Sequence, residues 1–182
     1  FAYIYTREGD AWVLEQKIES AGNAIQPVAI YDDKLVMGNK WCTGGYGGCF
    51  QYSIRTESGW SEKASQLPST GHIGSTYMGV AVDVDAERTV VGGSGNGTRD
   101  GGVAFVFRWD DGTWVEEAML YGDDTRYDDK FGASVSIEGD LIAVGATGHQ
   151  GNLGAAYVFR LIEGEWKQIA KLVPSDFTSS SR

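Results

Sequence analysis

Short runs of alternating and of wholly apolar residues follow one another along the chain, and their order repeats. In the clearest copy, residues 131–137 alternate between small or polar and apolar side chains, which is typical of a strand with one buried face. After a turn, residues 141–146 are continuously apolar, as in a strand covered on both faces. Two more strand-like runs follow at 154–159 and 166–172, and the last is more amphipathic. The pattern predicts units of four antiparallel strands.

Four tryptophans mark the repeat. They recur roughly every fifty residues, and each follows a short strand-like run at the same distance. The four residues are Trp12, Trp60, Trp114 and Trp166. A period of this length made of short strands predicts a β-propeller with one four-stranded blade per repeat. We expect each Trp to begin an outer strand and to fill the space that widens between neighbouring blades.

The repeat divides the chain into five parts. Residues 1–23 are predicted to be the last two strands of a blade, and 24–70, 71–122 and 123–173 are predicted to be whole blades. Residues 174–182 are predicted to lead into a next blade. The expected fold is therefore all-β, with about three and a half blades of a larger propeller, and we interpret the chain as a piece of a longer protein.

One set of motifs resembles a known family. Phe131-Gly132, followed by Val144-Gly145-Ala146 and by the run at 154–159, is similar to the FG-GAP repeat, with Thr147 where that repeat has proline. The resemblance implies the seven-bladed propeller of integrin α-subunits and of many extracellular proteins. It does not extend to the integrin calcium loop, because the turns between the first two strands are too short and lack the Asp-x-Asp-x-Asp-Gly pattern.

Charge and hydropathy exclude two classes of partner. The net charge of −10 and the pI of about 4.6 leave no basic surface for nucleic acid. No apolar run approaches the roughly twenty residues of a membrane-spanning helix.

Two features favour an extracellular or cell-surface location in the secretory pathway. Cys42 and Cys49 enclose a Gly-rich segment that can curl tightly enough to close a disulfide, although free thiols remain the alternative. A zinc site is disfavoured because two thiolates without a nearby His are an incomplete ligand set. Asn96 begins an N-glycosylation sequon, Asn-Gly-Thr.

An acidic stretch between the second and third blades is the candidate for ion chemistry. Asp123, Asp124, Asp128 and Asp129 could supply oxygen ligands to calcium. A solvated connecting segment, in which Asp side chains cap the turns, is the favoured interpretation. We therefore expect no cofactor, with calcium as the alternative.

The sequence offers few candidate catalytic residues. The two histidines, His72 and His149, lie in Gly-rich polar stretches without a nucleophile motif beside them. We expect no enzyme activity. A glycan-cleaving propeller with paired carboxylates is a third alternative, and no acid here shows an evident partner.

The segments that join the second and third strand of each blade are the expected recognition surface. They span residues 40–48, 94–101 and 147–153 and differ most between repeats. The candidate binding residues on them are Trp41, Tyr46, Asn96 and His149. The sequence therefore favours a non-catalytic propeller for adhesion, assembly, or protein and glycan binding. The alternative is a structural segment whose open faces are covered by further blades or by another subunit.

Overall fold

The computed structural model describes residues 1–19, 27–41, 47–61, 64–68, 77–95 and 101–175. The described chain is mainly β, with 67% of its residues in strands, and the one short helix in it is α1 (His149–Asn152). No helix in the described part is long and apolar enough to span a membrane.

The strands form a two-stranded hairpin followed by three larger antiparallel sheets. The hairpin consists of β1 (Ala2–Glu8) and β2 (Ala11–Ile18). The first sheet consists of β3 (Val28–Tyr31), β4 (Lys34–Asn39), β5 (Cys49–Thr56) and an outer strand in two pieces, β6 (Gly59–Trp60) and β7 (Ala64–Gln66). The second sheet consists of β8 (Met78–Val84), β9 (Arg88–Gly93), β10 (Val103–Asp110) and β11 (Thr113–Leu120). The third sheet consists of β12 (Phe131–Glu138), β13 (Leu141–Ala146), β14 (Ala155–Ile162) and β15 (Glu165–Leu172).

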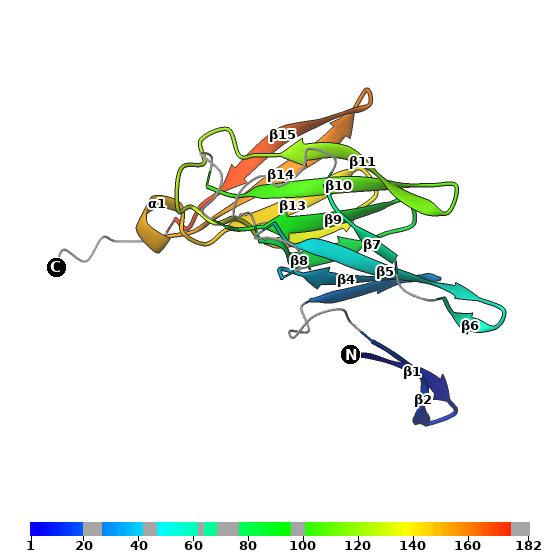
Figure 1. Ribbon diagram of the computed structural model, residues 1–182. Coiled ribbons are helices and arrows are strands. Elements are labelled where there is room, and N and C mark those ends of the chain that lie inside the picture. The colour runs from blue at the N-terminus through cyan, green and yellow to red at the C-terminus, as the bar shows by residue number, and fades with distance from the viewer. Residues whose placement is uncertain (20–26, 42–46, 62–63, 69–76, 96–100, 176–182) are drawn as a thin grey trace.

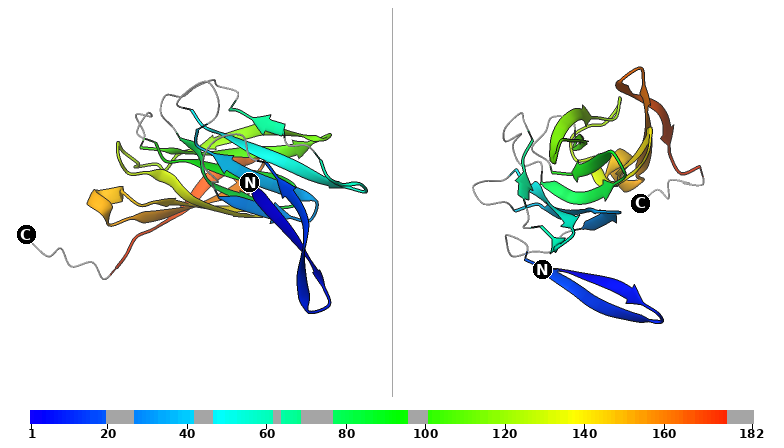
Figure 2. Two further views of the ribbon diagram at one scale, coloured as in Figure 1. Left: turned by 60° about the horizontal axis from the view of Figure 1, so that its bottom comes forward. Right: turned by 90° about the vertical axis from the view of Figure 1, so that its right-hand side faces the viewer.

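Each sheet is a blade in which strands pair in chain order. Figure 1 shows the sheets following one another from the blue hairpin to the C-terminal sheet, which is coloured from yellow to red. The right-hand view of Figure 2 shows the hairpin and the last sheet at opposite ends of the series. The first strands of neighbouring blades lie side by side, since β8 contacts β3 and β4 and β12 contacts β8 and β9. The predicted all-β fold of four-stranded propeller blades is confirmed.

Apolar side chains fill the space between consecutive blades. Phe107 of the second blade packs against Phe50 of the first, with ring centroids 4.9 Å apart. Tyr157 and Phe159 of the third blade share one core with Val106 of the second. A single blade has two apolar faces, and its neighbours cover them.

Equivalent repeat positions differ in exposure according to whether a neighbouring blade covers them. Trp60 and Trp114 are 6% and 2% exposed between blades, as predicted, whereas Trp12 on the hairpin is 68% exposed. At the other end, Leu172 is 59% exposed, while its counterpart Leu120 is 4% exposed. The expectation that all four tryptophans pack between blades is therefore wrong for Trp12, because no described segment covers the outer face of the hairpin. The expectation of two covered faces for residues 141–146 also fails at the exposed Ala143.

Glycines permit the closest approach of two blades. Gly132 has a φ of +85 and lies against the preceding blade. A Cβ added to it would be 2.3 Å from the Val103 carbonyl oxygen. Gly102 pairs with Phe131 in an isolated parallel bridge across the same junction. Main chains can meet this closely only where no Cβ intervenes. Gly132 was assigned to the repeat motif, but its contact with the preceding blade was not predicted.

A charged group also joins the second and third blades. The Arg88 Nε donates to Glu117 Oε2 at 2.8 Å, and the Trp166 indole N–H donates to the same oxygen at 3.2 Å. Burial acts to raise the Glu117 pKa, but hydrogen bonds from Arg88 and Trp166 outweigh it, so that the pKa lies below its usual value.

We expect Glu117→Gln to lower the free energy of unfolding by about 2 kcal/mol at neutral pH, the scale of a hydrogen bond to a charged group. Because the folded-state pKa is lowered, this contribution is present above the unfolded pKa of about 4.3 and is lost as the pH falls through the folded value. Urea unfolding of both proteins between about pH 3 and pH 7 tests this. A difference that stays constant across that range would contradict the assignment.

Candidate functional site

Two connecting segments meet at one end of the third blade. Residues 121–130 join β11 to β12, and residues 147–154 join β13 to β14 and contain α1. The Gly148 N–H donates to the Asp129 carbonyl oxygen at 2.8 Å. A Cβ at Gly148 would lie 2.0 Å from the Asp128 carbonyl oxygen, so the contact requires glycine. The two segments are therefore held together by the main chain.

The acidic segment is organised by its own turns. The Arg126 N–H donates to Asp129 Oδ2 at 2.9 Å, and the Asp129 N–H donates back to the Arg126 carbonyl oxygen at 3.0 Å. Asp128 and Lys130 adopt positive φ on either side of Asp129. The side chain of Asp129 is thereby turned inward and is 7% exposed. The predicted turn-capping by aspartate holds here, but on a buried residue.

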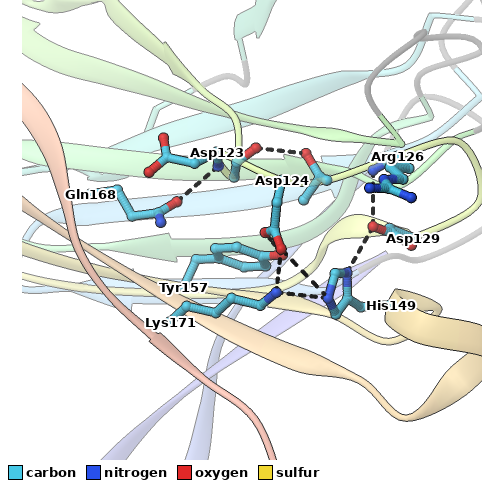
Figure 3. Close-up of polar contacts among 10 residues, drawn as sticks. Asp123, Asp124, Arg126, Asp129, His149, Tyr157, Gln168 and Lys171 are labelled. Carbon is cyan, nitrogen blue, oxygen red and sulfur yellow. Dashed lines mark hydrogen bonds and ion pairs between the residues drawn. The ribbon is translucent and has the colours of Figure 1, made fainter.

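His149 is buried at the centre of this end, although the sequence predicts it on a surface segment. It is 4% exposed, because the turn of α1 folds it back onto the blade. Its Nδ1 lies 2.8 Å from Asp129 Oδ2, and its Nε2 lies 2.8 Å from the Lys171 ammonium (Figure 3). An ammonium group can only donate, so Nε2 accepts and Nδ1 carries the proton donated to Asp129. Both ring nitrogens are engaged.

Asp124 completes the cluster from the exposed side. Its carboxylate accepts from the Tyr157 hydroxyl at 2.8 Å and from Lys171 at 2.5 Å (Figure 3). The hydrogen bond from Lys171 is the main reason that the Asp124 pKa lies below its usual value. Burial, and then the hydrogen bond to Asp124, raise the pKa of the Tyr157 phenol above its usual value. The phenol therefore stays protonated and remains a donor.

Removing the Lys171 ammonium group should take away the main hydrogen bond to the Asp124 carboxylate. In Lys171→Met we expect the Asp124 pKa to rise towards its ordinary value, because the largest influence that lowers it is lost. Carboxyl-detected NMR titration measures this pKa directly. Lys167→Met is the matched control, since Lys167 lies on the same strand and pairs with Glu165 instead. Equal Asp124 titration curves in both variants and the parent would contradict the Lys171 contact.

A small cavity opens beside this cluster. Its volume is about 270 Å³. The lining consists of Asp124, Arg126, Tyr127, Asp129, His149, Gln150 and Gly151. Tyr127 is 68% exposed at its rim, whereas Asp129 and His149 form its buried side. The cavity therefore combines acceptors, donors and one aromatic ring.

A second cavity, of about 480 Å³, lies at the opposite end among the turns that join the first and second strands. One of its carboxylates, Asp85, already accepts from the Glu87, Arg88 and Gly139 N–H groups. The last of these bonds crosses from the second blade to the third. We interpret this carboxylate as a structural link between blades.

The four candidate calcium ligands do not form one ligand set. Asp123 and Asp128 are exposed, while Asp124 and Asp129 bind the donors described above. Among the described residues no group of three or more His, Cys, Asp or Glu side chains could hold a metal ion. The geometry gives no support to a calcium site in this segment.

Trp41 follows β4 as His149 follows β13, so it lies at the same end of its blade. Its N–H donates to the Asn39 side-chain oxygen at 3.0 Å, and its ring meets Tyr77 edge-on at 5.4 Å. The Trp41 side chain is nevertheless 48% exposed. Two other candidates, Tyr46 and Asn96, lie outside the described residues.

The cysteines are described only in part. Cys49 begins β5, is 1% exposed and is not a free thiol. Cys42 lies outside the described residues, and its pairing with Cys49 stays a prediction.

The sequence did not identify two members of the cluster. Tyr157 was assigned only to the strand-like run at 154–159, and Lys171 was assigned to the amphipathic last strand. The signal that could have found Lys171 is its place on β15, where it is paired with Tyr157 across the ladder. Cross-strand partners lie close enough for their side chains to share one acceptor.

Comparison with known proteins agrees with the blade geometry. The family model for the FG-GAP repeat matches residues 114–159, from the outer strand of the second blade to the third strand of the next. No curated protein matches the chain. The chain therefore carries an FG-GAP repeat, set in a series of four-stranded β-propeller blades.

Proposed function

We propose that this chain is a non-catalytic, extracellular β-propeller module that binds a protein or glycan partner through the segments joining its second and third strands. The observation that carries the proposal is Trp41, a large aromatic side chain that is half-exposed and supported by Tyr77. Connecting segments on a rigid scaffold carry binding residues more often than the scaffold does. A fixed aromatic ring loses little conformational entropy when a partner covers it.

The extracellular part of the proposal is supported by the repeat, since FG-GAP repeats are typical of extracellular proteins. The Cys42–Cys49 disulfide and a glycan on Asn96 belong to the same proposal. Intact mass of the secreted protein, with and without reduction and N-glycosidase, tests both modifications. A mass unchanged by either treatment would contradict the secretory assignment.

The non-catalytic part rests on the engagement of the titratable groups. Both nitrogens of His149 are bound, and its neighbours Asp129 and Lys171 bind it in turn. A general base needs a nitrogen free to reach the proton that it abstracts.

Binding to a printed panel of glycans and purified extracellular-matrix proteins tests the recognition surface. We expect Trp41→Ala to weaken capture of any bound partner at least tenfold, the scale of an aromatic anchor. Trp12→Ala is the matched control, because Trp12 is also exposed but lies on the face of the hairpin. Equal capture by the parent and Trp41→Ala would rule out Trp41 as the anchor that carries the proposal.

A second function is favoured by the uncovered faces at the two ends of the blade series. Trp12 and Leu172 are exposed where their counterparts Trp114 and Leu120 are buried by a neighbouring blade. We infer that further blades or another subunit cover these faces in a larger assembly. Analytical ultracentrifugation of the 182-residue chain should then show self-association, and a stable folded monomer would contradict it.

A further inference from the structure

We propose that the cavity beside His149 is a binding site for one neutral sugar ring, which rests on the proposed binding function and gives it a ligand class. The volume of about 270 Å³ lies just below the roughly 300–1,000 Å³ of sites for drug-sized molecules. The cavity therefore accommodates one small ring and not an extended chain.

One acceptor in the cavity is unused. Asp129 is 7% exposed, and both of its described side-chain contacts, from the Arg126 N–H and His149, go to Oδ2. None of the described residues donates a hydrogen bond to Oδ1. The segment from 121 to 130 and the His149 contact hold this carboxylate in place, so its free oxygen is oriented before a ligand arrives.

The other lining groups select for hydroxyl groups. A sugar hydroxyl both donates and accepts, so it can satisfy a carboxylate such as Asp129 and a donor such as Arg126 or Gln150 at the same time. The ring of Tyr127 stands exposed at the rim, where it can cover the apolar C–H face of a sugar. Gly151, which has no side chain, is also part of the lining.

Charged ligands fit less well. An anion would lie against Asp124 and Asp129, and a cation would lie against Arg126. A metal ion lacks three converging ligands among the described residues. A neutral polyhydroxylated ring is the ligand class that meets no unfavourable charge here.

Saturation-transfer NMR and calorimetry with the 182-residue chain test the proposal, using methyl glycosides of glucose, galactose, mannose, N-acetylglucosamine and fucose. We expect at least one glycoside to bind saturably with a Kd on the order of 1 mM. Tyr127→Ala should weaken that binding at least tenfold, and Tyr127→Phe should retain most of it, because stacking needs the ring and not the hydroxyl. Tyr31→Ala is the matched control, since Tyr31 is also an exposed tyrosine and lines the cavity at the opposite end.

Three results would overturn the site. The first is the absence of saturable binding up to about 20 mM glycoside, twenty times the expected Kd. The second is an equal loss of glycoside affinity in Tyr127→Ala and Tyr31→Ala. The third is tighter binding of sialic acid, glucosamine or calcium than of any neutral glycoside. Failure of the sugar site can be distinguished from failure of the proposed binding function. If no glycoside binds while Trp41→Ala still abolishes capture on the printed panel, only the sugar site is wrong. If Trp41→Ala leaves capture unchanged, Trp41 is not an anchor of the recognition surface, whatever the glycosides do.

Discussion

Trp114→Ala is expected to lower the free energy of unfolding by about 4 kcal/mol, within the range found for buried Trp or Phe truncation. Trp114 is 2% exposed between the first and second blades and packs edge-on against Trp109 at 4.9 Å. Its indole N–H has no hydrogen-bond partner among the described residues. The loss therefore comes from packing and from the cavity that remains. Chemical denaturation followed by tryptophan fluorescence and circular dichroism measures it.

The repeat supplies its own control for this substitution. Trp12 occupies the equivalent position on the hairpin and is 68% exposed, so Trp12→Ala should change the stability by no more than about 0.5 kcal/mol. Similar losses for the two variants would mean that the described junction between the first and second blades is wrong, or that the hairpin face is covered in solution.

Gly132→Ala should lower the free energy of unfolding by about 3 kcal/mol, and it tests the junction between main chains. The added methyl group meets two obstacles, the Val103 carbonyl oxygen at 2.3 Å and the Gly93 nitrogen at 2.9 Å. Both belong to the backbone of the preceding blade, so the two blades must separate. The positive φ of +85 adds about 1 kcal/mol to this cost. Urea denaturation of the variant measures the total.

Gly112→Ala separates the two costs. Gly112 has nearly the same φ, +87, but nothing lies within 4 Å of a Cβ added there. We expect this control to lose only about 1 kcal/mol, the cost of the backbone conformation. If Gly132→Ala were no more harmful than Gly112→Ala, the blades would not approach as closely as described.

Together these variants test one geometric rule. Apolar side chains of each blade pack against those of the blade before it, as the contact of Phe107 with Phe50 and the core shared by Tyr157 and Val106 show. The same rule leaves Trp12 and Leu172 uncovered at the two ends of the described series. Exposure at these positions therefore depends on a neighbouring blade and not on the residue.

The strands and their grouping into blades could be predicted from the chain alone. Alternation at 131–137 and the recurring Trp set depend on the two-residue period of a strand and on a repeated length, which are both local properties. The FG-GAP motif at Phe131-Gly132 added the blade type, and the family match confirms it.

Part of the candidate site could be predicted in the same way. Trp41 was assigned correctly to an exposed connecting segment, because the segment is Gly-rich and follows an apolar strand. The four aspartates were recognised as one group, since they lie within a single short stretch. Their roles were not predictable, because exposed Asp123 and buried Asp129 are both aspartates in the same loop.

The buried cluster depended on the folded arrangement. His149 and Asp129 are twenty residues apart, and Lys171 is a further turn and strand away, so no local period relates them. Only the antiparallel pairing of β14 with β15, and the contact of Gly148 with Asp129, bring the three side chains within hydrogen-bond distance. Local periodicity was sufficient to determine strands and blades because it acts on neighbouring residues, whereas the site joins residues that meet only when separate strands and loops pack together.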